Sequence, residues 1–344
     1  LDVPDLDHVF PTQLCTVMAI HELPAVIHQC LFAYHKLNTA QRSRLWQRRL
    51  AYADHDKIRM MAKDKAIGID FNAKAIATDD DPIASFARFK TKPYHSSKTD
   101  HSGLAKGHTV SIDHLSGFKV KTTHGAQSCY VAICYATNYV WCVLVKGRDD
   151  FGAVLNTVAS TIAAQGGRLR RLRADSAPEI IAGDGAKQAA ILGTTIEPVG
   201  TYSPASGGKH EKAIQHLCHK TRACLLLACW LPANCWGPAI QWACTLVNIT
   251  PTKLNGSNVS PYERWYEHPP NMKKLNIHTF GAPCTFGLTK AQRMATPAGK
   301  MSALTVSAFF LGRSGHMALL LHDGRVITGA FNRIEFYEGV FCAR

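Results

Sequence analysis

Three acidic residues fall where carboxylates could hold divalent cations. Asp113 lies in the motif VSIDHLSG, Asp175 in LRADSAPE and Glu211 in SPASGGKHEK, with thirty-five residues between the second and the third. Hard cations prefer carboxylate oxygens, and two cations ~4 Å apart can activate a nucleophile and stabilise the leaving oxygen of a phosphodiester. Each residue taken singly also has an ordinary explanation, as a helix cap, a partner of a helix dipole or a structural charge. The trio and its spacing favour a metal site.

The elements around these residues predict how they are positioned. Asp113 lies in the middle of a predicted strand, Asp175 at the end of another, and Glu211 at the start of a long helix. The order of three antiparallel strands followed by alternating helices and strands predicts an α/β fold with a ribonuclease-H-like core. The predicted strands span 109–120, 129–135, 139–146, 168–174 and 195–199, and the predicted helices span 149–164, 178–192, 209–229 and 232–248.

The remainder of the chain divides into further parts on either side of a core at 109–270. Residues 1–89 form an N-terminal region that is helical in part, because apolar residues between 37 and 58 recur at helical spacing. A basic linker follows at 90–108. Short strands separated by glycine turns predict a small C-terminal β barrel within 271–344. These strands span 306–311, 317–321, 325–328 and 334–337.

Composition narrows the class of protein. The 344-residue chain has a formal net charge of +14, with 46% apolar and 19% charged residues, which excludes intrinsic disorder. The longest apolar run, from Ala223 to Leu231, is too short to cross a bilayer, so nucleic acid is favoured over a membrane as the partner of the positive charge. The twelve cysteines include no CxxC pair, which favours reduced thiols. Because the chain starts at Leu1 without a signal pattern, we expect a piece of a polyprotein.

The three acidic blocks resemble the catalytic blocks of copia-type LTR-retrotransposon integrases, and the resemblance covers most of the chain. LWQRRLAYADHDKI at 45–58 is similar to the pre-integrase zinc region of that family. LPANCWGPAIQWACTLVNITPTK at 231–253, SPYERWY at 260–266 and FGAP at 280–283 are similar to the segments that follow its catalytic core. The order and spacing of the blocks, rather than any single block, carry the resemblance.

The resemblance implies a polynucleotidyl transferase, the integrase part of a Gag-Pol polyprotein, which processes element DNA ends and joins them to target DNA. It implies that Asp113, Asp175 and Glu211 are both the catalytic residues and the ligands of a two-metal site for Mg²⁺ or Mn²⁺. It also implies that the substrate is double-stranded DNA and that the protein is a homo-oligomer. The place of action would be the nucleus, after synthesis in the cytoplasm.

The zinc region departs from the family pattern. The family carries two histidines and two cysteines there, whereas Gln47 and Tyr52 stand at the histidine positions and Ile83 and Phe86 at the cysteine positions. These side chains cannot build a tetrahedral zinc site. We therefore predict a degenerate motif and no zinc.

Other departures keep a second interpretation open. Asn-Gly pairs usual in the family are replaced by Ser176-Ala177 after the second aspartate and by Gly207-Gly208 before the glutamate. Such losses are compatible with a catalytically degenerate DNA-binding or interaction remnant of the same fold. A different ribonuclease-H-like nuclease is a third interpretation, which the integrase-like flanking blocks disfavour.

Basic residues surround two of the acidic blocks. Lys209, Lys212, His216 and Lys220 share the predicted helix of Glu211, and Arg173 lies on the strand before Asp175. Beside a metal site such residues would capture DNA phosphates, and binding would weaken as salt rises. For each residue taken singly, a solvated helix or strand face is an equally open explanation.

Overall fold

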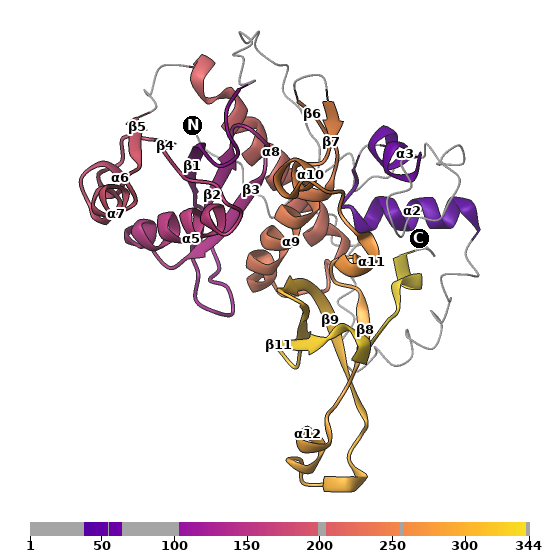
Figure 1. Ribbon diagram of the computed structural model, residues 1–344. Coiled ribbons are helices and arrows are strands. Elements are labelled where there is room, and N and C mark those ends of the chain that lie inside the picture. Colours follow the sequence, from indigo (N-terminus) through magenta and orange to yellow (C-terminus); the bar gives the residue numbers. More distant parts are fainter. Residues whose placement is uncertain (1–37, 54, 64–102, 199–203, 255–256, 342–344) are drawn as a thin grey trace, which may run out of the picture.

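The computed structural model describes residues 38–53, 55–63, 103–198, 204–254 and 257–341 (Figure 1). Within these ranges the chain builds two five-stranded sheets and a two-stranded hairpin. Ile83 and Phe86 of the degenerate zinc motif, and residues 90–102 of the predicted linker, lie outside the described residues. The boundaries predicted for the N-terminal region and the linker therefore stay predictions.

The first sheet has the strand order and directions of a ribonuclease-H-like core. The strands lie in the order β3-β2-β1-β4-β5, antiparallel from β3 to β1 and parallel from β1 to β5. All five were expected from the alternation of apolar residues, and the α/β prediction is confirmed. Their bounds are β1 (Thr109–Leu115), β2 (Ser128–Cys134), β3 (Val140–Val145), β4 (Arg171–Ala174) and β5 (Thr195–Pro198).

Helices cover both faces of this sheet (Figure 1). Val110 and Ile112 of β1 lie in a core with α5 (Phe151–Ala163) and α7 (Asp184–Leu192). On the opposite face, Val131 of β2 packs against two longer helices. These are α8 (Pro204–Leu227) and α9 (Trp236–Ile249). Successive side chains of a strand point to opposite faces of the sheet. In β1, the residues that alternate with Val110 and Ile112 therefore face α8 and α9.

The helices differ in part from their predicted ranges. The predicted helix 178–192 is divided into α6 (Pro178–Ile181) and α7. Gly185 lets α7 approach α5 closely, since a Cβ atom added there would lie only 2.4 Å from the ring of Phe151. The long helix α8 begins at Pro204 rather than at 209, and proline is well suited to a first helical turn, where its missing N–H has no partner to lose.

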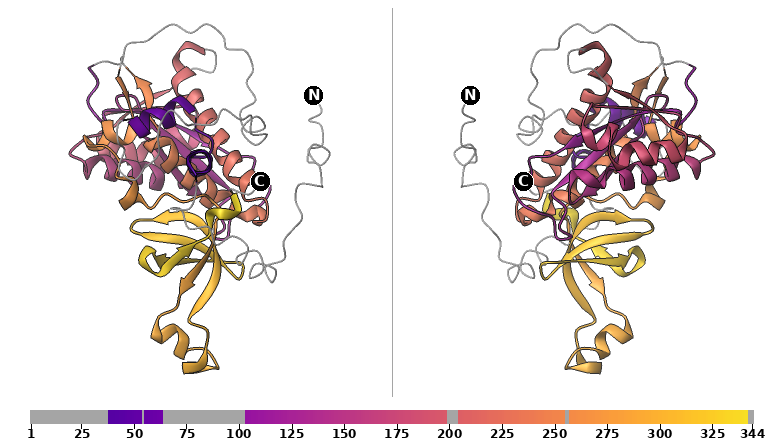
Figure 2. Two further views of the ribbon diagram at one scale, coloured as in Figure 1. Left: turned by 90° about the vertical axis from the view of Figure 1, so that its right-hand side faces the viewer. Right: turned by 90° about the vertical axis from the view of Figure 1, so that its left-hand side faces the viewer.

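The second sheet forms the C-terminal β domain. Its hydrogen-bonded order is β11-β10-β9-β8-β12, and among the described strands no pairing joins β11 to β12. The segment between β8 and β9, which carries α12 (Lys290–Met294), projects away from the remainder of the molecule (Figure 2). The strands span β8 (Pro283–Gly287), β9 (Thr305–Ser314), β10 (Met317–His322), β11 (Arg325–Ala330) and β12 (Ile334–Phe336).

Shorter elements connect these parts. None of the helices in the described ranges is long and apolar enough to cross a membrane. The hairpin consists of β6 (Thr252–Leu254) and β7 (Ser257–Val259), and it is followed by α10 (Pro261–Tyr266) and α11 (Met272–Leu275). Single 3-10 turns span Arg148–Asp150, Ala233–Cys235, Gly299–Met301, Phe331–Arg333 and Glu338–Phe341.

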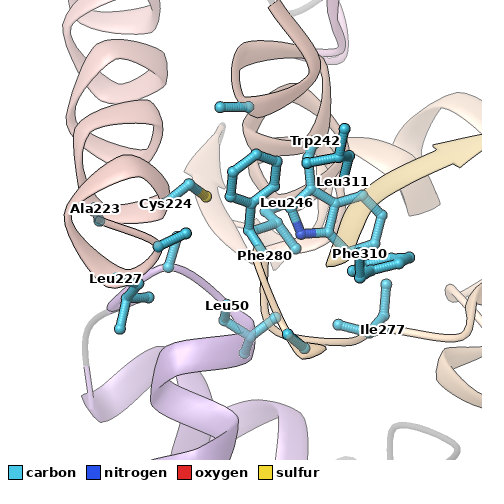
Figure 3. Packing of buried hydrophobic residues seen from close by; sticks show 14 of the residues in the cluster. Leu50, Ala223, Cys224, Leu227, Trp242, Leu246, Ile277, Phe280, Phe310 and Leu311 are labelled. Carbon is cyan, nitrogen blue, oxygen red and sulfur yellow. The ribbon is translucent and has the colours of Figure 1, made fainter. Parts of the chain in front are cut away.

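The N-terminal helices α2 (Thr39–Arg49) and α3 (His55–Lys63) share a core with the other parts of the chain (Figure 3). Leu50, after α2, lies in one apolar cluster with Leu227 of α8 and Trp242 of α9. Phe310 of β9 belongs to the same cluster. This core therefore joins the N-terminal helices, the two long helices and the C-terminal sheet.

A buried carboxylate fastens the end of the described chain to α2. Glu338 accepts hydrogen bonds from the Arg49 guanidinium, from the backbone N–H and hydroxyl of Thr279, and lies 3.0 Å from Nδ1 of His278. Burial alone would raise the pKa of Glu338, but the charges of Arg49 and His278 outweigh it and hold this pKa well below 4.5. The carboxylate is charged and fully partnered, which marks it as a structural group.

Candidate active site

Asp113 lies in the middle of β1 and faces the α8 side of the sheet. It pairs with Val131 of β2, which belongs to the core under α8 and α9. The Asp113 side chain is 45% exposed, so it lies at an open edge of that core. One carboxylate oxygen, Oδ1, accepts the backbone N–H of His114 at 2.7 Å.

The register of the sheet brings Asp175 next to Asp113. The parallel ladder between β1 and β4 pairs Val110 with Leu172 and Ser111 with Arg173. Continuing this register by two residues sets Asp175 beside Asp113, on neighbouring strands that run ~4.8 Å apart. Asp175 is exposed just beyond the last residue of β4. The continued register thus aligns two of the three predicted ligands at one end of the sheet.

The helix α8 presents a histidine to Asp113. Nε2 of His210 lies 3.6 Å from Oδ2 of Asp113, and the His210 side chain is only 8% exposed. Glu211, the next residue, is exposed. His210 rather than Glu211 faces the sheet because of helical spacing: Leu217, seven residues further along α8, is fully buried and lies on the same face of the helix as His210.

Sequence reasoning missed His210, although a signal for its position was present. The spacing from His210 to Leu217 is that of an inner helical stripe, whereas Glu211 shares its stripe with the half-buried Cys218. Glu211 was singled out because it is acidic, although its neighbour His210 is the more buried of the two. His210 is therefore added to the site, and both of its ring nitrogens have no hydrogen-bond partner among the described residues.

The surroundings of Asp113 favour its charged form. Burial acts to raise the pKa of the Asp113 carboxyl, but His210 and the His114 N–H act in the opposite direction and the pKa lies below 3.8. At 3.6 Å the pair with His210 is longer than a hydrogen bond. Asp113 is consequently a carboxylate at neutral pH.

His114 points to the opposite face and does not join this site. Its Nε2 lies 2.8 Å from the hydroxyl oxygen of Ser128, and its ring lies 4.8 Å from that of Tyr130. Burial, followed by the charge of Arg148, lowers the pKa of His114. Of the two ionisable residues in the middle of β1, only Asp113 faces α8.

The chain is similar in sequence to part of a known polyprotein. It is 22% identical over 269 residues to the retrovirus-related Pol polyprotein from transposon TNT 1-94 of Nicotiana tabacum, and the match covers 78% of this chain. It spans about a fifth of that polyprotein, since the match covers 19% of the relative's length. No protein-family model matches the chain.

Two solved structures are similar in fold. A simian T-cell lymphotropic virus intasome, in complex with a PP2A regulatory subunit, has a chain with a TM-score of 0.41 and 14% identity, covering 72% of this chain and 84% of that one. The catalytic core domain of BIV integrase has a TM-score of 0.34 and 18% identity, covering 47% of this chain and 95% of that one. Because both TM-scores are below 0.5, the fold assignment rests on the strand order and directions of the chain itself.

The three predicted ligands do not form a compact cluster as described. Among the described residues, no three His, Cys, Asp or Glu side chains are placed so that they could hold a metal ion together. Asp113 and His210 are a pair, while Asp175 and Glu211 are exposed nearby in the fold. Joint coordination by Asp113, Asp175 and Glu211 in this chain therefore stays a proposal.

The predicted DNA-binding residues fall into different environments. Lys212 is exposed and His216 is half-buried on α8, whereas the side chain of Lys209 lies outside what the structure describes. Arg173 donates a hydrogen bond to the Tyr135 hydroxyl at 2.9 Å. Nothing in these placements tests DNA contact.

Lys220 requires a correction. It is 3% exposed, and its ammonium donates a hydrogen bond of 2.6 Å to the backbone carbonyl of Leu50. The prediction of a DNA contact at Lys220 is wrong for this fold, because the group is enclosed between α8 and the turn that follows α2. The sequence alone does not reveal this buried position, because a lysine on the inner side of a helix cannot be distinguished from a solvated lysine until its hydrogen-bond partner is known.

Proposed function

We propose that the chain is a metal-dependent polynucleotidyl transferase that processes the ends of element DNA and joins them to target DNA. The proposal is supported by the parallel register of β1 and β4, which aligns Asp175 with Asp113 when it is continued two residues beyond its last pair, and by the place of Glu211 on α8 next to His210, which lies near Asp113. We propose these three residues as the catalytic, metal-binding triad for Mg²⁺ or Mn²⁺. Double-stranded DNA, a homo-oligomeric assembly and action in the nucleus belong to the same proposal.

The residues present suit a divalent cation. Asp113 is charged, half-exposed and has Oδ2 without a hydrogen bond among the described residues, and the unpartnered nitrogen of His210 points at the same oxygen. A bound cation pair would supply an activated nucleophile and stabilise the leaving oxygen of the phosphodiester. In this proposal, Asp113 on β1, Asp175 just after β4 and Glu211 on α8 would hold the cations.

Capture of DNA is assigned to the exposed basic residues next to the site. Lys212 follows Glu211 directly and is exposed, so its charge can reach a phosphate without a desolvation cost. The net charge of +14 supports the same role for the chain as a whole. Lys220 is excluded from this surface by its burial.

Strand transfer of a short DNA duplex in Mn²⁺ tests the proposal. The wild-type chain is compared with Asp113→Asn and Glu211→Gln, which remove charge and keep shape. We expect joined products from the wild type alone. Products at the same level from all three proteins would overturn the assignment of the site, and no product from the wild type would overturn the enzyme proposal.

A second candidate function is favoured by one observation. Because no three ligands are grouped among the described residues, the chain could also be a DNA-binding remnant that keeps the fold without catalysis. The same assay separates the two functions when DNA binding is measured beside it. Salt-sensitive binding by all three proteins, together with no strand transfer by any of them, would support the remnant.

A further inference from the structure

We infer that His210 is a nitrogen ligand of a divalent cation held beside Asp113, a fourth metal-binding residue in addition to the three carboxylates. The inference deepens the proposed function, on which it rests, because it concerns the same cation site. It predicts that the site is not built of oxygen alone, and that it selects among divalent cations differently from a site that has only carboxylate and water ligands.

The first argument is the state of the His210 ring. The side chain is more than nine-tenths buried, yet neither Nδ1 nor Nε2 has a hydrogen-bond partner among the described residues. Buried polar atoms without a partner are uncommon, and each costs free energy comparable to a lost hydrogen bond. A cation at Nε2 would satisfy one of them, so the position is explained by a ligand that the ring binds.

The second argument is the distance between the two donor atoms. Nε2 of His210 and Oδ2 of Asp113 lie 3.6 Å apart, which is too long for a hydrogen bond. Two donors that bind one cation at ~2.1 Å each lie ~3.0 to 3.4 Å apart for octahedral or tetrahedral angles. The pair is therefore close to the spacing of two ligands on one ion, and a small adjustment of either side chain completes it.

The third argument is the open side of the pair. Asp113 is 45% exposed, while His210 covers it from α8. A cation between the two side chains would keep coordination positions toward solvent, where Asp175 and Glu211 are both exposed. Water, a carboxylate or a DNA phosphate can take these positions. A site with two close protein ligands, Asp113 and His210, is thus compatible with a cation that acts on a substrate.

The chemistry of imidazole determines which cations benefit. A neutral imidazole nitrogen suits transition metals, whereas Mg²⁺ prefers oxygen ligands. One nitrogen ligand should therefore strengthen the binding of Mn²⁺ and Co²⁺ more than that of Mg²⁺. Loss of the ring should lower Mn²⁺ affinity at least about tenfold, since changes even to outer-shell partners of a metal site commonly cost that much.

The experiment measures Mn²⁺ bound to the full chain, in the absence of DNA. Electron spin echo envelope modulation of bound Mn²⁺ registers a directly coordinated nitrogen, and titration calorimetry gives the affinity. His210→Leu replaces the imidazole with an apolar side chain of similar length and so removes the nitrogen. His210→Gln is a second variant, which puts a different polar group at this position. His316→Leu, at an exposed histidine in the turn between β9 and β10 of the C-terminal β domain, is the matched control. Circular dichroism checks the folding of each protein.

We expect a nitrogen modulation in the wild type and in His316→Leu, and its loss in both His210 variants together with the tenfold weaker binding. Mn²⁺ that binds with a dependence on Asp113 but shows no nitrogen would overturn the inference and leave the proposed function standing. A nitrogen signal that survives in both His210 variants would overturn it as well. If the wild type shows no Mn²⁺ binding that is lost in Asp113→Asn, both the inference and the metal site of the proposed function are overturned.

Discussion

Two carboxylates of this chain, Glu338 and Asp113, have opposite environments. Glu338 is 7% exposed and accepts hydrogen bonds from Arg49 and Thr279 as well as contacting His278. Asp113 is 45% exposed, accepts the N–H of its own neighbour, and has a histidine nearby that is too distant for a hydrogen bond. Both carboxyls have a pKa below the ordinary value, so the charge is favoured at both positions.

The two carboxylates differ in whether their oxygen atoms remain available to bind a further ligand. The oxygens of Glu338 are used by protein donors, so the group stabilises the fold and has little capacity for a further ligand. The Oδ2 atom of Asp113 faces an unpartnered imidazole and solvent, so the group can accept a cation. A lowered pKa alone therefore does not distinguish a structural carboxylate from a functional one, whereas the number of satisfied lone pairs does.

The largest effect is expected for Asp113→Asn. Strand transfer should fall by about a thousandfold or more, since loss of a ligand to the cation removes several kcal/mol of transition-state stabilisation. The melting temperature should change little, because asparagine keeps the Oδ1 atom that accepts the His114 N–H and only the charge beside His210 is lost. Joined product and thermal unfolding are measured on the same preparations. Asp184→Asn, an exposed aspartate on α7, is the control and should change neither quantity.

Glu338→Gln should show the reverse pattern. Breaking a buried ion pair by neutralising one partner should lower the free energy of unfolding by ~3 kcal/mol, measured by urea denaturation. Strand transfer per folded molecule should not change, because α2 and the 3-10 turn lie outside the candidate site. Glu267→Gln is the comparison, since Glu267 makes an exposed ion pair with Lys106 and its loss should not be measurable. A loss of activity without a loss of stability in Glu338→Gln would contradict the distinction between the two carboxylates.

The contribution of Glu338 should also depend on pH in a defined direction. Its pKa in the folded state is below its ordinary value of 4.5, so the stabilisation is complete above pH 4.5 and is lost as the pH falls through the folded-state pKa. The difference in unfolding free energy between the wild type and Glu338→Gln should therefore be constant near neutral pH and shrink in acid. Urea denaturation at several pH values measures it, and a difference that grows as the pH falls would be inconsistent with a charged, paired Glu338.

A smaller loss of stability is expected for Lys220→Met. The substitution keeps the length of the side chain and removes the ammonium that donates to the Leu50 carbonyl, at a cost of about 2 kcal/mol. DNA binding should keep the salt dependence of the wild type, because Lys220 is buried. Urea denaturation and binding isotherms at several salt concentrations measure the two quantities. A changed salt dependence with unchanged stability would restore Lys220 to the DNA surface.

The smallest effect is expected for Lys212→Gln on α8. Because Lys212 is exposed, the free energy of unfolding should not change measurably. DNA affinity should fall severalfold at low salt, and the slope of log affinity against log salt should become shallower by about 0.9 if one phosphate contact is lost. An unchanged slope would remove Lys212 from the proposed DNA surface.

Much of the fold could be predicted from local patterns. The strands that carry Asp113 and lead to Asp175 have alternating or continuous apolar residues between turn residues, and these patterns are set by neighbours in the chain. The turn between β2 and β3 is another such case, because Asn138 adopts a φ of +61°, which asparagine tolerates better than most residues. In these elements the local preference and the tertiary structure agree.

The features that were missed depend on contacts between distant parts of the chain. Glu338 and Arg49 are 289 residues apart, and Lys220 and Leu50 are 170 apart, so no local pattern pairs them. The short strand β8 was overlooked because its first residue is a proline, and its partners β9 and β12 follow much later in the sequence. His210 was missed for a different reason: its helical spacing to the buried Leu217 is a local signal, but only the packing of α8 shows that this side of the helix faces Asp113.

The central claim is that Asp113 holds a divalent cation in the candidate site. The most direct test is a crystal structure of the full chain grown with Mn²⁺, with an anomalous difference map collected to locate the ion. The account predicts a peak within about 2.2 Å of an Asp113 carboxylate oxygen and of Nε2 of His210, toward Asp175. A structure with Mn²⁺ at saturating concentration, no peak at Asp113, and the Asp113 oxygen turned to a protein donor would contradict it.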